Sequence, residues 1–282
     1  MSQRPDPWSV DPRDPRAPPQ EIWDRMTDAQ RRRIVDSLPS EFEPDEARPP
    51  EGDEHTEQVF GARTALRRFF GRTGRRVYVG TNLPVYYPGE SMFSPDVIAV
   101  LDVDTHPRPS WIVSKEGKGL DLALEVIVLG HRRKDLERNV EYYAALGIRE
   151  YFVFDRPRLE LQGFRLRDGT SGYEPLVPQL GRFPSAVLGL DLKVEGERLR
   201  FFIGDAAVPG ANDLIETLEG AMSALQQRLE SAESRAEDEA RRAEDEARRA
   251  EAAEARLKEA LAELERLRST ARGVRSGSER PL

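Results

Sequence analysis

Asp96 and Glu125 are the residues of this sequence best placed to do chemistry, because each carries a charge into an apolar run. Asp96 follows Pro95 and opens the run Val97–Val103, and Glu125 lies within the run Leu122–Leu129. A carboxylate in such a run is costly to bury unless it is paired or holds a cation. Two of them on neighbouring strands would make an oxygen-rich site, which suits Mg²⁺ rather than zinc. A magnesium ion between them could activate water and hold a phosphodiester.

Each acidic residue also has a purely structural interpretation. Asp96 could belong to a Pro-Asp turn before a strand, and Glu125 could be a strand-end carboxylate that reaches solvent. The two residues together indicate a metal site more specifically than either residue alone. In the structural interpretation, two apolar strands would each carry a charged residue without a chemical role.

The surrounding sequence predicts the elements that would position this pair. Apolar residues at helical spacing predict a helix over 55–71 that ends at Gly71, and another over 132–147 that ends at Gly147. Strand-like apolar runs predict a sheet. These runs are residues 76–79, 83–87, 97–103, 122–129 and 148–154. Helix, strands, helix and strand in this order predict an α/β fold with a mixed sheet flanked by helices.

Short hairpins are expected after Pro157. The first runs from 160–166 through Asp168-Gly169 to 173–176, and the second from 191–194 through Glu195-Gly196 to 198–202. Alternating apolar residues on either side of such turns are typical of β-hairpins.

Four segments of this sequence resemble one known family. They are Ser94-Pro-Asp-Val-Ile-Ala-Val, Leu124-Glu-Val-Ile, Arg133-Lys-Asp-Leu-Glu-Arg and the stretch from Glu141 to Asp155. They are similar to the Uma-two family of restriction-endonuclease-like proteins, within the PD-(D/E)XK nuclease superfamily. The resemblance covers about residues 51–205 and implies a restriction-endonuclease-like fold with a divalent-metal phosphodiesterase site.

The resemblance implies a metal site built on the acidic pair. Asp96 occupies the Pro-Asp position and Glu125 the second acidic position, as ligands of Mg²⁺ or Mn²⁺. The backbone carbonyl of Ile127 or Val126 is the further ligand it implies. The superfamily has a lysine two residues after the glutamate, where this sequence has Ile127, and in the Uma-two pattern that lysine moves to the position of Asn139.

The missing lysine leaves the positive charge of the site to another residue. An asparagine amide cannot supply that charge to a phosphate in the transition state. Lys134, Arg138 and Arg133 on the same predicted helix are the candidates, and we expect Lys134 to be the catalytic cation. Arg133, Arg138 and Asn139 are then expected to contact phosphate. His55 and Glu57 begin the first helix, where some superfamily members have an accessory acid, and a structural role is the simpler interpretation of both.

The two ends of the chain differ from this central domain. Residues 1–50 are rich in proline and are expected to form an extended or disordered arm with one short helix, capped by Thr27. Residues 213–268 carry apolar or small residues at heptad spacing, which predicts a coiled coil and self-association. The heptad positions at the centre of this segment hold alanine and glutamate, which should pair weakly. The alternative is therefore a lone charged helix held by Glu–Arg pairs. A disordered tail is expected over 269–282.

Composition excludes several classes of function. The chain of 282 residues has no cysteine and three histidines, which excludes disulfide frameworks, thiol catalysis and cysteine-based zinc sites. The net charge of −8 argues against attraction of the whole protein to nucleic acid, although a local basic surface is compatible with it. No apolar run approaches the roughly 20 residues that span a bilayer. The polar N-terminus lacks the apolar segment of a signal peptide, so we expect a cytoplasmic location and no membrane partner.

Three functions fit these observations. The leading hypothesis is a divalent-metal-dependent endonuclease, with DNA as the first substrate to test and RNA left open. The alternative is a catalytically impaired module of the same fold that binds nucleic acid or a protein partner, using the basic residues Arg132, Arg133, Lys134 and Arg138. A third is a scaffold in which the coil alone is functional, which leaves the acidic pair unexplained. The sequence contains no P-loop, no dinucleotide-binding fingerprint and no zinc-protease motif.

Overall fold

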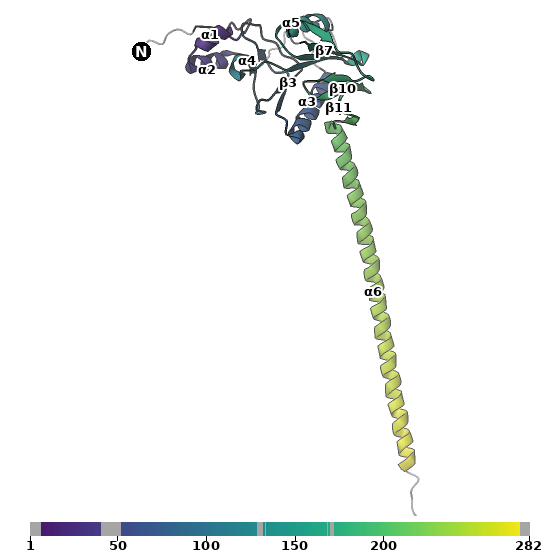
Figure 1. Ribbon diagram of the computed structural model, residues 1–282. Coiled ribbons are helices and arrows are strands. Elements are labelled where there is room, and N and C mark those ends of the chain that lie inside the picture. The colour runs from purple at the N-terminus through teal and green to yellow at the C-terminus, as the bar shows by residue number, and fades with distance from the viewer. Residues whose placement is uncertain are drawn as a thin grey trace, which may run out of the picture. The chain divides into compact units, whose positions relative to one another are not determined.

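The computed structural model describes residues 7–40, 52–128, 132, 134–167, 169 and 172–276, without the side chains of 211–212 and 270–276. The chain divides into two compact units, residues 1–214 and residues 215–282. The first unit contains the strands and most of the helices, and the second consists of one long helix, which Figure 1 labels α6.

A six-stranded mixed sheet forms the centre of the first unit, with the strand order β1-β3-β5-β6-β7-β8. Strands β5 and β6 are parallel, with Leu122 opposite Glu150, and the other neighbours are antiparallel. This confirms the predicted α/β class and mixed pairing. The strands are β1 (Val77–Thr81), β3 (Val97–Leu101), β5 (Leu122–Ile127), β6 (Glu150–Asp155), β7 (Glu160–Leu166) and β8 (Tyr173–Pro175).

Helix α3 (Asp53–Thr73) packs on one face of this sheet. Its buried positions include Val59, Leu66 and Phe70, which join Leu124 and other sheet residues in the largest apolar cluster. The helix does not stop at Gly71 as predicted. It continues to Thr73 and ends at Gly74, which has the left-handed φ of 69° that favours glycine.

The other face of the sheet is covered by two consecutive helical segments. Residues Lys134–Arg138 form a π-helix (η1), and Asn139–Ala145 continue as the α-helix α5, followed by Gly147 with a φ of 75°. The predicted helix over 132–147 is therefore present, but its first turn is wider than an α-helical turn. Tyr143 packs there against Tyr151 and Phe93 in a second apolar cluster.

A second, four-stranded sheet follows, in the order β12-β11-β10-β9. The predicted hairpin is formed by β10 (Leu190–Glu195) and β11 (Arg198–Ile203). The flanking strands β9 (Phe183–Ser185) and β12 (Ala206–Ala207) were not predicted, because each has too few residues to show a period of two. Leu199 and Phe201 of β11 pack against the cluster that contains α3.

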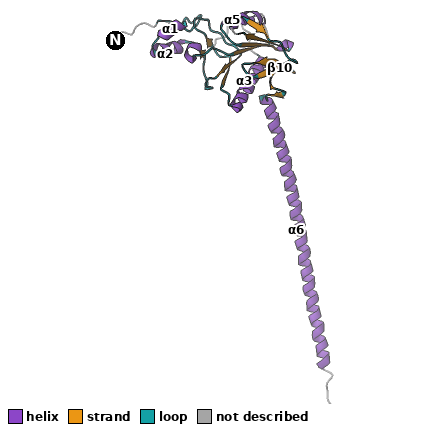
Figure 2. Ribbon diagram, viewed as in Figure 1, coloured by secondary structure: helices purple, strands orange, loops and turns teal. Residues whose placement is uncertain are grey.

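The N-terminal residues contain two short helices rather than the one predicted, α1 (Gln20–Arg25) and α2 (Asp28–Ser37), drawn as separate coils in Figure 2. Thr27 caps α2 and exchanges hydrogen bonds with Gln30 in a capping box, as its position predicted. Trp23 and Ile34 join a third apolar cluster with residues of β2 (Val85–Tyr86) and β4 (Trp111–Ile112). These two strands are parallel. Strand β2 lies within the predicted run 83–87, whereas β4 and the short helix α4 (Val113–Glu116) that follows it were not predicted.

Helix α6 (Ala211–Ser276) runs without interruption. It extends beyond residue 268, the predicted end of the coil, and residues 277–282 of the predicted tail lie outside the described residues. Its large apolar side chains are exposed, among them Leu225 and Leu264. None of the described helices is both long and apolar enough to cross a membrane.

Candidate functional site

Asp96 and Glu125 lie side by side at one end of the central sheet. The β3–β5 register pairs Val97 with Leu124, and its continuation by one residue places Asp96 opposite Glu125. Each side chain bonds the backbone of the other strand. The Val126 amide donates to Asp96 Oδ2 at 2.7 Å, and the Asp96 amide donates to Glu125 Oε2 at 3.3 Å. The predicted convergence of the two carboxylates is therefore present.

Glu125 is deeply buried, and the protein supplies donors to its other oxygen. The Tyr143 hydroxyl donates to Glu125 Oε1 at 2.8 Å, and Asn139 Nδ2 lies 3.4 Å from the same atom. Desolvation and the neighbouring charges of Asp96 and Asp135 raise the pKa of Glu125 well above its usual range. A cation placed here would lower that pKa and relieve the repulsion among the acids.

The π-helix η1 brings two further polar side chains to this cluster. Asn139 Nδ2 also donates to Asp135 Oδ1 at 3.0 Å, so its amide links two acidic residues. Lys134 precedes Asn139 by five residues, the spacing that a π-helix brings to successive turns. The Lys134 ammonium lowers the pKa of Glu125, although less strongly than burial and the neighbouring acids raise it. The charge of Lys134 therefore acts on the acidic pair.

His55 completes the cluster from the opposite helix. Its Nε2 lies 3.1 Å from Asp96 Oδ2, and the side chain is buried in the first turn of α3. This contact was only weakly indicated beforehand, because a histidine at the start of an amphipathic helix is equally compatible with a structural role.

Asp155 lies at the same end of the sheet and was not predicted as a site residue. It is paired with Ile127 in the parallel β5–β6 register. Its burial raises its pKa, but hydrogen bonds from Arg132 and Arg158 outweigh that effect and the net pKa is lowered. A buried acid held by two arginines therefore lies at the same end of the sheet as the acidic pair. Its signal in the sequence is its position as an acidic residue directly after the apolar run 151–154, at the end of β6.

In the described part of the chain, the remaining predicted site residues have no hydrogen bond or ion pair with Asp96, and Asn139 alone among them bonds Glu125. Ile127 is buried at the end of β5, and Arg138 is exposed on η1. Arg133 lies outside the described residues. Asn139 is 7 % exposed and faces the carboxylates, so a phosphate contact through its amide stays a prediction.

The donor set of the cluster suits a hard divalent cation that is only partly enclosed by protein. Among the described residues, no three His, Asp or Glu side chains are grouped so that they could hold a metal ion by themselves. Mg²⁺ is commonly bound by one or two carboxylates, with water and substrate phosphates as its other ligands. Asp96 and Glu125 provide those two carboxylates, and each of their oxygens can accept more than one bond.

Comparison with known proteins decides the family. The model of the Uma2 family, described as "Putative restriction endonuclease", matches residues 44–195, which is more than half of the chain. The chain belongs to the Uma2 family. No curated protein matches it. A solved structure described as a "putative nuclease belonging to DUF820" from Anabaena variabilis ATCC 29413 is similar at 13% sequence identity and a TM-score of 0.43, covering 57% of this chain and 93% of that chain.

The part that matches the Uma2 family contains the whole acidic cluster, from His55 to Asp155. It leaves out α1 and α2, the strand β11 and the long helix α6. The elements that distinguish this chain from the Uma2 model therefore lie before and after the candidate site.

Proposed function

We propose that this Uma2 protein is a divalent-metal-dependent endonuclease that hydrolyses phosphodiester bonds of nucleic acid, with DNA as the first substrate to test. The observation that carries the proposal is the reciprocal bonding of Asp96 and Glu125 across β3 and β5, which holds two buried carboxylates together. Folding alone does not explain the pair, because burial and a like charge both raise the pKa of Glu125.

The residues of the cluster divide into distinct roles in this proposal. Asp96 and Glu125 would hold Mg²⁺ or Mn²⁺, with the Ile127 carbonyl as a further oxygen ligand. When bound, such an ion lowers the pKa of a bound water and stabilises negative charge on a phosphate. His55 fixes the orientation of Asp96 through its contact at 3.1 Å, and Tyr143 does the same for Glu125.

Lys134 would supply the positive charge that Asn139 cannot. Its charge already acts on Glu125. A cation beside the reacting phosphate stabilises the negative charge that develops in the transition state. The exposed Arg138, and Arg133 beside it in the sequence, would add contacts to flanking phosphates.

One observation favours a second function without cleavage. Asn139 donates its amide to both Glu125 and Asp135, which places a neutral group where the family pattern has lysine. A protein of this kind could keep the nucleic-acid surface and lose turnover. In that case the chain is a binding module that assembles through α6.

Cleavage assays with purified full-length protein separate the two functions. Plasmid, single-stranded DNA and RNA are incubated with Mg²⁺, with Mn²⁺ or with a chelator. We expect metal-dependent cleavage, and we expect Asp96→Asn and Glu125→Gln each to abolish it. The double variant should lose little more activity than either single variant, because the effects of groups that act as a unit are not additive. Arg32→Gln, at an exposed position of α2, serves as a control that should retain turnover. Salt-sensitive binding without cleavage by the wild type would favour the binding module, and neither binding nor cleavage would refute both.

We further propose self-association through α6 and a cytoplasmic location. Ile215, Leu218, Met222, Leu225 and Leu229 alternate spacings of three and four along α6, and all five are more than half exposed. Such a seam is typical of a helix that pairs with another. Two subunits would bring two sites to one duplex.

A further inference from the structure

The part of helix α3 that follows Glu57 concentrates positive charge, in a protein with a net charge of −8. The stretch from Gln58 to Gly89 contains six arginines and neither aspartate nor glutamate. Four of the arginines, Arg63, Arg67, Arg68 and Arg72, lie on α3 itself. We call these four residues the α3 arginine strip.

The strip is available to a partner. Arg67, Arg68 and Arg72 are exposed, and Arg63 is half-buried. In the described part of the chain, no ion pair involves any of the four. Most other arginines of this unit are paired, for example Arg156 with Glu54 and Glu197. The charge of the strip is therefore not neutralised within the fold.

Helix stability does not account for the strip. Arg63 and Arg67, and likewise Arg68 and Arg72, are four residues apart, and like charges at this spacing destabilise a helix. The helix dipole favours a basic residue in the last turn, which explains Arg72 but not the other three. The strip is therefore a candidate for contact with a ligand.

The position of the strip connects it to the candidate site. The first turn of α3 carries His55, which contacts Asp96, and the helix then leads away from the acidic pair. At a rise of 1.5 Å per residue, Arg72 lies about 25 Å along the helix from His55, which equals about seven base pairs of duplex. The strip therefore lies on the helix that contributes His55 to the site, at a separation that one bound nucleic acid could span.

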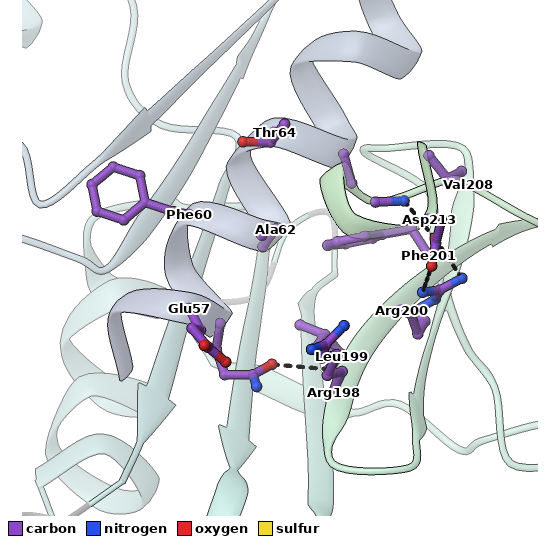
Figure 3. Close-up of a pocket in the computed structure, with 14 residues that line it drawn as sticks. Glu57, Phe60, Ala62, Thr64, Arg198, Leu199, Arg200, Phe201, Val208 and Asp213 are labelled. Carbon is purple, nitrogen blue, oxygen red and sulfur yellow. Dashed lines mark hydrogen bonds and ion pairs between the residues drawn. The ribbon is translucent and has the colours of Figure 1, made fainter. Parts of the chain in front are cut away.

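A pocket lies against the same helix, although none of the four strip arginines lines it. It has a volume of about 270 Å³ and lies between α3 and β11, with Phe60 and Gly61 on the helix and Arg198 on the strand. Figure 3 shows the helix residues of this pocket across from Arg198 and Arg200. Asp213 pairs with Arg200, and the other charged lining residues are the exposed Arg198 and the exposed Glu57.

We propose that the α3 arginine strip binds the phosphate backbone of the nucleic acid that flanks the candidate site, without reading its sequence. This inference rests on the proposed function, in that it takes the substrate to be nucleic acid. Guanidinium groups bind phosphate in a bidentate manner, and contacts to phosphate set position and affinity rather than specificity. The strip would thus hold the substrate while the acidic cluster acts on it.

The test measures binding of full-length protein to labelled random-sequence DNA, as duplex and single strand, in a chelator so that no cleavage occurs. The variant replaces Arg67, Arg68 and Arg72 with glutamine. Each phosphate contact contributes about 0.9 to the slope of log affinity against log salt, so the slope should fall by about 3. A fourfold increase in salt should then weaken the wild type about 40-fold more than the variant.

Matched controls separate the strip from general charge and from folding. Glutamine at Arg13, Arg25 and Arg32, which are exposed elsewhere in the same unit, removes the same charge and should leave the slope unchanged. Lysine at the three strip positions keeps the charge and should keep most of the slope. Thermal melting of each variant checks the fold.

The outcomes distinguish this inference from the proposed catalysis. Cleavage by the wild type together with an unchanged slope in the strip variant would refute the strip and leave the catalysis intact. Binding that depends on the strip without any cleavage would support the strip and refute the catalysis. Strip-dependent binding to phosphatidylserine vesicles with no binding to DNA would refute the strip as a nucleic-acid surface.

Discussion

Tyr143→Phe tests the electrostatics of the acidic cluster with a single atom. The Tyr143 hydroxyl donates to Glu125 Oε1 at 2.8 Å, and the ring packs against Phe93 and Tyr151. Phenylalanine keeps the packing and removes the donor. Because Tyr143 is 2 % exposed, water does not readily replace that donor. Losing a hydrogen bond to a charged group costs about 1.5–3 kcal/mol, compared with about 0.5–1.5 kcal/mol for a neutral one.

The sign of the pH dependence follows from the raised pKa of Glu125. The folded state binds the proton of Glu125 more tightly than the unfolded state, so stability falls as pH rises from the unfolded pKa through the raised folded pKa. The hydrogen bond from Tyr143 favours the ionised form. Its removal should therefore cost most above the raised pKa of Glu125 and least below it.

Urea denaturation of metal-free protein at several pH values measures this effect. Tyr142→Phe is the matched control, because its hydroxyl donates to the neutral Ser91 carbonyl at a longer 3.3 Å in a half-buried position. We expect it to cost less than about 1 kcal/mol at every pH. In a Glu125→Gln background the cost of Tyr143→Phe should shrink to that of a neutral hydrogen bond. Equal costs for the two tyrosines, or no change in that background, would refute the assignment of Glu125 as an ionisable acid held by Tyr143.

Three other predictions follow from the same structure. Asn139→Lys should raise metal-dependent cleavage and lower the pKa of Glu125, since the new ammonium would lie where the amide now donates. Unchanged turnover in this variant, together with an inactive Lys134→Ala variant, would show that Lys134 already supplies the charge. Asp155→Asn should lower the free energy of unfolding at neutral pH by only about 1.5 kcal/mol, because both arginine partners of Asp155 are partly exposed. It should also weaken the fall in the free energy of unfolding as the pH drops below about 4. An unchanged fall in that range would contradict the lowered pKa of Asp155. Truncation after Leu214 keeps the first unit and should lower the mass measured by light scattering from that of an oligomer to that of a monomer, whereas a monomeric full-length chain would exclude pairing through α6.

The sequence was most informative where a pattern extended over many residues. The runs around Ala99 and Leu124 predicted the two central strands within two residues of their bounds, because strands covered on both faces are almost entirely apolar. The same runs made Asp96 and Glu125 conspicuous, so the acidic pair could be found before its geometry was known.

The parts that were missed depend on contacts distant in sequence or on very short elements. The contact of His55 with Asp96 joins a helix to the sheet on which it packs, and no local pattern encodes it. The π-helix η1 has the composition of an ordinary helix, and its wider turn changes which residues face Glu125. A strand of two residues such as β4 cannot show a period at all.

The N-terminal residues have a consequence for what counts as the smallest stable piece of this protein. Arg16 donates to the Gly89 carbonyl and Ala17 bridges Pro88, which ties the first residues to the loop that leads into Asp96. Excising residues 44–195 alone would remove these ties and expose the apolar rings and chains that Trp23 and Ile34 now cover. It would also remove Phe201 from the opposite side of the core. A gene fragment for expression or directed evolution should therefore span residues 7–214, because cutting at the family boundary would turn a packed interior into an aggregating surface.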